Sequence, residues 1–137
     1  MGHEREAHEI AKELNVEFIH VDNDPLGNKW NVGFHACKNY NADGVIFMGS
    51  SDWASDEYIE SASYILKDFP FIGMFGCHFV DVADEVRLVH WPGYLGGKRQ
   101  YEPIGIGRVL RSDILEKMNW TPFQESLSAG LDWSMYL

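Results

Sequence analysis

The chain has few cysteines, few basic residues and no long apolar run. Its two cysteines, Cys37 and Cys77, lie 40 positions apart and lack a C-x-x-C partner, so neither a disulfide framework nor a zinc ribbon is expected. No apolar run approaches the roughly 20 residues of a membrane-spanning helix. The N-terminal residues also lack the apolar stretch of a signal peptide. We therefore expect a cytoplasmic protein without a membrane span.

The scarcity of basic residues limits the possible partners. The chain has 11 Lys and Arg against 21 Asp and Glu, a formal net charge of −10 at pH 7. Such a field repels phosphate backbones, which argues against nucleic acid as a partner. Hydrophobic residues make up 45% of the 137 residues and charged residues 23%, as in an ordinary globular protein. The length fits one domain spanning residues 1–137.

Helix and strand patterns alternate through the first half of the chain, as in an α/β fold. The apolar run over 45–48, between Gly44 and Gly49, predicts a strand that is covered on both faces and central in the sheet. Ser55 is expected to cap the next helix. The expected elements, in order, are a helix over 7–14 that Asn15 ends, a strand over 16–21, a helix over 29–40, a strand over 45–48, a helix over 55–66, a hairpin of 71–82 with 86–91, a strand over 104–110, a helix over 112–118 that Ser112 caps, and a helical turn over 132–136.

Asp52 is the first candidate for a functional site. It follows the buried strand closely, and open α/β sheets bind their ligands at the carboxyl ends of strands. A carboxylate there can hold Mg²⁺ or Mn²⁺, which prefer oxygen ligands and bridge carboxylates to a substrate diphosphate. The alternative is that Asp52 only closes the turn before the helix at Asp56, and both interpretations stay open.

The order of several motifs resembles the family 2 type of GT-A glycosyltransferases. In that family a glycine-bearing loop and a basic-x-Asn element precede a helix, a buried strand follows, and a D-x-D metal motif ends it. The elements that carry the resemblance are Asn23, residues 25–31 (Pro-Leu-Gly-Asn-Lys-Trp-Asn), Asp43, residues 45–53, residues 107–113, and Gly130-Leu131-Asp132-Trp133, which is similar to the family's G-E-D-W element.

The resemblance implies a GT-A-like fold, a Rossmann-like three-layer α/β/α sheet of the nucleotide-diphospho-sugar transferases. The family begins with a strand, a helix and a second strand, and this chain starts at the helix that follows them. The sheet is therefore expected to be incomplete at the N-terminus and to keep an open edge. An open edge favours pairing with another copy, so we expect a homo-oligomer.

The same resemblance implies roles for individual residues. Lys29, Asn31, Ser51 and Asp52 would bind the nucleotide-sugar donor, with Mn²⁺ or Mg²⁺ on Asp52. Asp132 would be the general base toward the acceptor hydroxyl of a glycan or other molecule. Lys29 fits an exposed helix start equally well.

Aromatic and histidine side chains supply further candidates. Trp91 and Trp133 are candidate stacking platforms for an acceptor sugar, although packing is the commoner role of such residues. His78 and His90 lie in the two arms of the expected hairpin, where pairing could bring them together. Both a metal site and ordinary packing stay open there.

Two departures from the family pattern leave a second function open. Ser50-Ser51-Asp52 stands where D-x-D is common, so a hydroxyl replaces one carboxylate ligand. Leu131 stands where a glutamate usually precedes the catalytic aspartate. The first hypothesis is a glycosyltransferase that moves a sugar from a nucleotide-diphosphate sugar to a hydroxyl. The second is a non-catalytic domain of the same fold that binds nucleotide or glycan, or assembles with itself.

Overall fold

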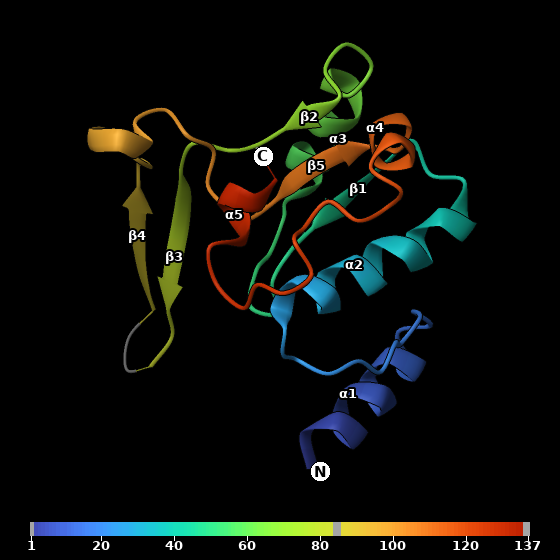
Figure 1. The fold of residues 1–137 in the computed structure, drawn as a ribbon. Coiled ribbons are helices and arrows are strands. Elements are labelled where there is room, and N and C mark those ends of the chain that lie inside the picture. Colours follow the sequence, from blue (N-terminus) through green and yellow to red (C-terminus); the bar gives the residue numbers. More distant parts are fainter. Residues whose placement is uncertain (1, 84–85, 136–137) are drawn as a thin grey trace.

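Two small antiparallel sheets and the helices around the larger one make up the structure (Figure 1). The computed structural model describes residues 2–83 and 86–135, and the side chains of all of these except residues 2–4, 132 and 133. The elements are α1 (Gly2–Glu13), α2 (Leu26–Cys37), the 3-10 turn η1 (Lys38–Tyr40), β1 (Gly44–Phe47), α3 (Asp56–Ile65), β2 (Phe71–Ile72), β3 (Cys77–Asp81), β4 (Arg87–Trp91), the 3-10 turn η2 (Gly97–Arg99), β5 (Arg108–Arg111), α4 (Ser112–Lys117) and α5 (Leu131–Ser134).

The larger sheet has the order β1-β5-β2, with β5 antiparallel to both neighbours. The expected strand over 45–48 forms as β1, but it lies at the edge of this sheet, so the expectation that it is central is wrong. The central strand is β5, where Val109 and Leu110 are each 3% exposed. Within β1 only Phe47 is buried, and residues 44–46 are half-buried. An apolar run indicates a strand, yet it does not show which strands become its neighbours.

Helices cover both faces of this sheet. On one face α2 and the segment after α4 enclose an aromatic core, where Phe47 lies against Phe34 and Phe123 with ring centroids 5.7 and 5.5 Å apart. On the other face α3 contributes Ala62 and packs toward Val109. Successive strand residues point to opposite faces, which is why one strand serves both clusters. The chain is therefore a mixed α/β protein with antiparallel sheets.

Residues 16–21 do not form the expected strand. They are irregular, and Val16 and Phe18 are 57% and 38% exposed. A strand needs a neighbour for its backbone hydrogen bonds, and no described strand lies beside this segment. The preceding helix ends as expected, because Asn15 adopts a left-handed conformation with φ of 52°.

The expected hairpin is confirmed as β3 and β4, but its first arm is shorter than predicted. Residues 71–82 do not form one strand: Phe71–Ile72 joins the larger sheet, and the chain then crosses to the hairpin. Two glycines lie where the crossing segment approaches other parts of the chain too closely for a side chain. A Cβ on Gly73 would lie 2.5 Å from Pro103, and one on Gly76 would lie 2.7 Å from the carbonyl oxygen of Trp91.

The helix boundaries agree with expectation except in detail. The Ser55 cap is confirmed, since its hydroxyl accepts a hydrogen bond from the Tyr58 amide at 3.3 Å. Ser112 is not the predicted cap of α4: it is the first helical residue, and its hydroxyl donates to the carbonyl of Ala42. The helix expected over 29–40 is α2 followed by η1. The final helix covers residues 131–134, and residue 136 of the expected turn lies outside the described part. Within that part, no helix is long and apolar enough to cross a membrane.

Candidate functional site

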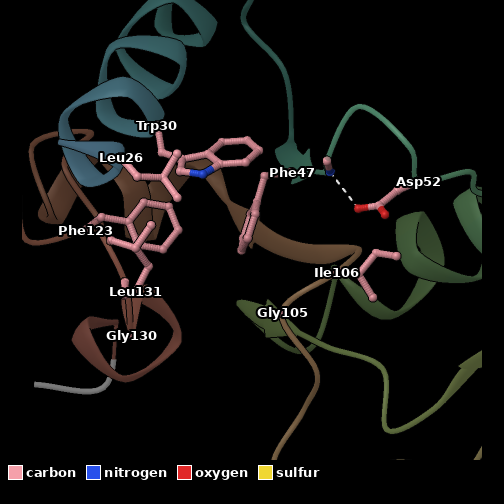
Figure 2. A pocket seen from close by; sticks show the side chains of 11 residues that line it. Leu26, Trp30, Phe47, Asp52, Gly105, Ile106, Phe123, Gly130 and Leu131 are labelled. Atoms are coloured by element: carbon pink, nitrogen blue, oxygen red, sulfur yellow. Dashed lines mark hydrogen bonds between the residues drawn. The ribbon is translucent and has the colours of Figure 1, made fainter. Parts of the chain in front are cut away.

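A pocket of about 300 Å³ opens beyond the carboxyl end of β1, between the start of α2 and the start of α5 (Figure 2). Its walls are mainly apolar and include three aromatic rings. Among the described lining residues, Asp52 is the one charged side chain. The lining consists of Leu26, Trp30, Phe47, Gly49, Asp52, Gly105, Ile106, Phe123, Ala129, Gly130 and Leu131.

A tight turn holds Asp52 at this pocket. One carboxylate oxygen, Oδ2, accepts a hydrogen bond from the Gly49 amide at 2.6 Å, and the Asp52 amide donates to the Gly49 carbonyl at 3.1 Å. The first of these bonds is drawn in Figure 2. The two interpretations of Asp52 are therefore compatible, because the same carboxylate closes the turn and lines the pocket.

The opposite wall begins at Gly130, which has φ of 70° and directly precedes α5. Gly130 and Leu131 both line the pocket, so the sequence motifs around Asp52 and around 130–133 meet although they are far apart in the chain. Asp132 and Trp133, the predicted base and acceptor platform, follow in α5, and their side chains lie outside the described residues.

Asn31 has an internal structural role. Its side chain is 2% exposed, its amide donates to the Phe123 carbonyl at 2.8 Å, and its oxygen accepts from the Phe123 amide at 3.1 Å. This pair of bonds fixes residue 123 against α2 and places the Phe123 ring in the pocket wall. Both groups of the predicted donor-binding amide are thus already occupied by the protein.

Gly27 brings the same two segments into direct contact. Its amide donates to the Leu127 carbonyl at 2.8 Å, and a Cβ at this position would lie 2.2 Å from the carbonyl oxygen of Gln124. Any larger residue would push the 124–127 segment away from α2. This glycine in the first turn of α2 therefore serves backbone packing beside the pocket.

The third wall, Gly105 and Ile106, is held by two side chains. The Tyr58 hydroxyl donates to the Gly107 carbonyl, and burial raises the pKa of this phenol, so it remains a protonated donor. The Arg108 guanidinium donates from Nε to the Ile104 carbonyl and from Nη2 to the Pro103 carbonyl, both at 2.8 Å. Sequence patterns did not single out either residue for this role, because the bonds are made to backbone carbonyls, which any residue offers.

Three further predicted site residues do not line the pocket. The Lys29 ammonium donates to the Asn23 side-chain oxygen at 2.7 Å, and Ser51 is exposed. Trp91 lies at the end of β4, where its ring meets Tyr94 edge to face with centroids 5.1 Å apart. The structure therefore brings together Asp52 and the α5 segment, and it leaves these three residues outside their pocket.

The aromatic walls were missed by sequence reasoning. Trp30, Phe47 and Phe123 come from α2, β1 and the segment before α5, and their rings lie within 6.5 Å of one another by centroid distance. Periodicity marked Trp30 and Phe47 as apolar positions of their elements, which does not distinguish core from pocket wall. No local pattern marks Phe123.

The described residues contain no preassembled metal centre. No group of three or more His, Cys, Asp or Glu side chains gathers among them. One carboxylate at a pocket nevertheless fits the way Mg²⁺ is usually held, by one or two carboxylates together with substrate phosphates and water. Cys37 offers no reactive thiolate, because burial, and then the nearby carboxylate of Glu17, raise the pKa of its thiol.

Comparison with known proteins yields no relative. No family model, no curated protein and no solved structure matches the chain. The family resemblance therefore rests on motif order alone.

Proposed function

We propose that the chain is a GT-A-like glycosyltransferase domain that moves a sugar from a nucleotide-diphosphate sugar to an acceptor hydroxyl. One observation supports this most. Two motifs that the resemblance assigns to one active site, at Asp52 and at 130–133, contribute to the walls of one pocket. Chance matches in a sequence have no reason to meet in space.

The proposal gives each side of the pocket a task. Asp52 would bind Mn²⁺ or Mg²⁺, which would neutralise the charge of the diphosphate leaving group. Asp132, in the first turn of α5, would take the proton of the acceptor hydroxyl. The rings of Trp30 and Phe123 offer flat apolar faces on which a sugar or base can pack.

The charge of the pocket makes a cation necessary for this function. The described lining contains no lysine or arginine, and the nearby Lys29 donates to Asn23. A diphosphate beside Asp52 in a chain of net charge −10 is repelled unless a cation lies between them. Nucleotide and metal should therefore bind cooperatively.

We expect Mn²⁺ to tighten the binding of UDP or GDP by about tenfold or more, within the usual range of coupling between two ligands. Asp52→Asn should abolish this coupling, because the substitution removes the negative charge that binds the metal. The turn should persist, because the amide oxygen can still accept the hydrogen bond from the Gly49 amide. Asp56→Asn, the same change at an exposed position in the first turn of α3, is the control and should leave it intact. Isothermal titration calorimetry of each nucleotide with and without Mn²⁺ measures the coupling.

Equal nucleotide affinity with and without Mn²⁺, or coupling that survives Asp52→Asn, would remove Asp52 from the metal site. A folded Asp52→Asn protein is verified by its unchanged thermal transition.

A second candidate, a self-assembling domain, is favoured by one edge of the larger sheet. Within the described residues β1 pairs with β5 alone, which leaves its other edge unpaired, and residues 16–21 expose apolar side chains without a sheet partner. Unpaired edges are templates for pairing between chains. Two copies related by a twofold axis are the simplest assembly.

We expect static light scattering to show a concentration-dependent dimer. Val16→Lys, which places a charge on the apolar segment, should shift the equilibrium toward monomer by about fivefold or more. Tyr64→Lys, at a side chain 70% exposed on α3, is the matched control and should have no effect. A strict monomer over a wide concentration range would contradict the assembly.

A further inference from the structure

His78 and His90 stand directly opposite each other on the hairpin. They form a registered pair in the β3–β4 ladder, and their ring centroids are 4.8 Å apart at an interplanar angle of 36°. Both side chains are exposed to solvent. The hairpin lies apart from the larger sheet, on the left of Figure 1, and neither histidine lines the pocket described above.

The spacing of the two rings fits a shared metal ion. Zn–N bonds are about 2.0–2.1 Å long, and a tetrahedral ion that binds two imidazoles places their ring centroids about 5 Å apart. The observed 4.8 Å is close to that separation. Both residues are carried by paired strands, which limits the entropy lost when they bind an ion together.

We propose that His78 and His90 form a bidentate site for a borderline divalent cation such as Zn²⁺. Imidazole nitrogen suits Zn²⁺, whereas Mg²⁺ and Mn²⁺ prefer oxygen, so this site differs in chemistry from the one proposed at Asp52. No third His, Cys, Asp or Glu gathers with the pair among the described residues. Water therefore fills the remaining positions and leaves the ion open to an added ligand.

The ion would also stabilise the hairpin. An isolated two-stranded hairpin is at best marginally stable, and this one leaves Val80 and Leu88, the next pair on the same face, 57% and 67% exposed. An ion held by both strands closes the loop between them and adds its binding free energy to the folded form. Metal binding and protection of the β3–β4 amides should therefore rise together.

Isothermal titration of the full chain with Zn²⁺ tests the site. His78→Asn and His90→Asn should each weaken binding at this site by about tenfold or more, since even changes around metal ligands cost 10–100-fold in affinity. His35→Asn, at an exposed histidine of α2, is the control and should bind like the parent. Asp52→Asn should also bind Zn²⁺ here normally, which separates this proposal from the proposed function.

Hydrogen exchange supplies the second readout. Zn²⁺ should slow exchange of the β3 and β4 amides in the parent and in His35→Asn, and it should not do so in His78→Asn. Three results would each overturn the proposal: no Zn²⁺ binding by the parent, binding by the two hairpin variants as tight as that of the parent, or binding that leaves β3–β4 exchange unchanged.

Discussion

Replacing Arg108 by alanine is expected to lower the free energy of unfolding by about 3 kcal/mol or more. The side chain is fully buried at 0% exposure, and its guanidinium donates to the carbonyls of Pro103 and Ile104. Removing it leaves two carbonyls without their donor, each worth about 1–3 kcal/mol when buried, and opens a cavity in the central strand. The same loss releases the segment that leads to Gly105 and Ile106 in the pocket wall.

Urea denaturation followed by tryptophan fluorescence measures this change. Arg108→Lys should lose less than alanine, because one ammonium can still donate, although it does not reproduce the planar fork of the guanidinium. Arg5→Ala, at an exposed ion pair with Glu9 on α1, is the control and should leave the midpoint unchanged. An Arg108→Ala protein as stable as the parent would show that the two carbonyls do not depend on this donor.

Asp132→Asn is expected to lower the turnover rate by about a hundredfold or more, the usual scale for the loss of a general base. The preceding residues Gly130 and Leu131 line the pocket, and Asp132 follows in the first turn of α5. The proposed role needs the ionised carboxylate, which is the form that accepts a proton. Asparagine has nearly the same shape, so donor binding should be preserved while the chemical step is lost.

Transfer kinetics at saturating donor, with the best substrate from a panel of UDP- and GDP-sugars, measure this effect. Glu125→Gln, which neutralises an exposed carboxylate in the segment before α5, is the control and should keep the parental rate. An Asn variant with near-parental turnover would eliminate Asp132 as the base. Donor affinity measured separately shows whether the loss lies in binding or in chemistry.

Local features of the fold could be predicted from the sequence because their causes are local. Ser55 caps α3 through a hydrogen bond within its own turn, and Asn15 ends α1 by its own left-handed conformation. The hairpin at 77–91 follows from two apolar strands around a short polar connection. The prediction of a strand over 16–21 was wrong because a strand needs a neighbouring strand to pair with, and local composition does not reveal one.

Some residues of the candidate site could also be predicted from local patterns, and others could not. Asp52 could be identified from its place after a buried strand, and the glycine-led segment at 130 from its motif. Asn31 could not be recognised as structural, because its partner, the backbone of residue 123, is 92 positions away. Phe123 was missed because the rings that it contacts, Trp30 and Phe47, are also far away in the sequence.

From the amino-acid sequence alone one can obtain the globular composition, the acidic charge, the order of most helices and strands, and the position of one carboxylate after an apolar strand. These depend on residue type and on spacing within one or two turns of chain. Three further features require the tertiary structure: β5 is the central strand, the aromatic rings enclose a pocket, and His78 faces His90. Such features depend on the register and packing of distant segments, where many pairings have similar local energies and the whole core selects one.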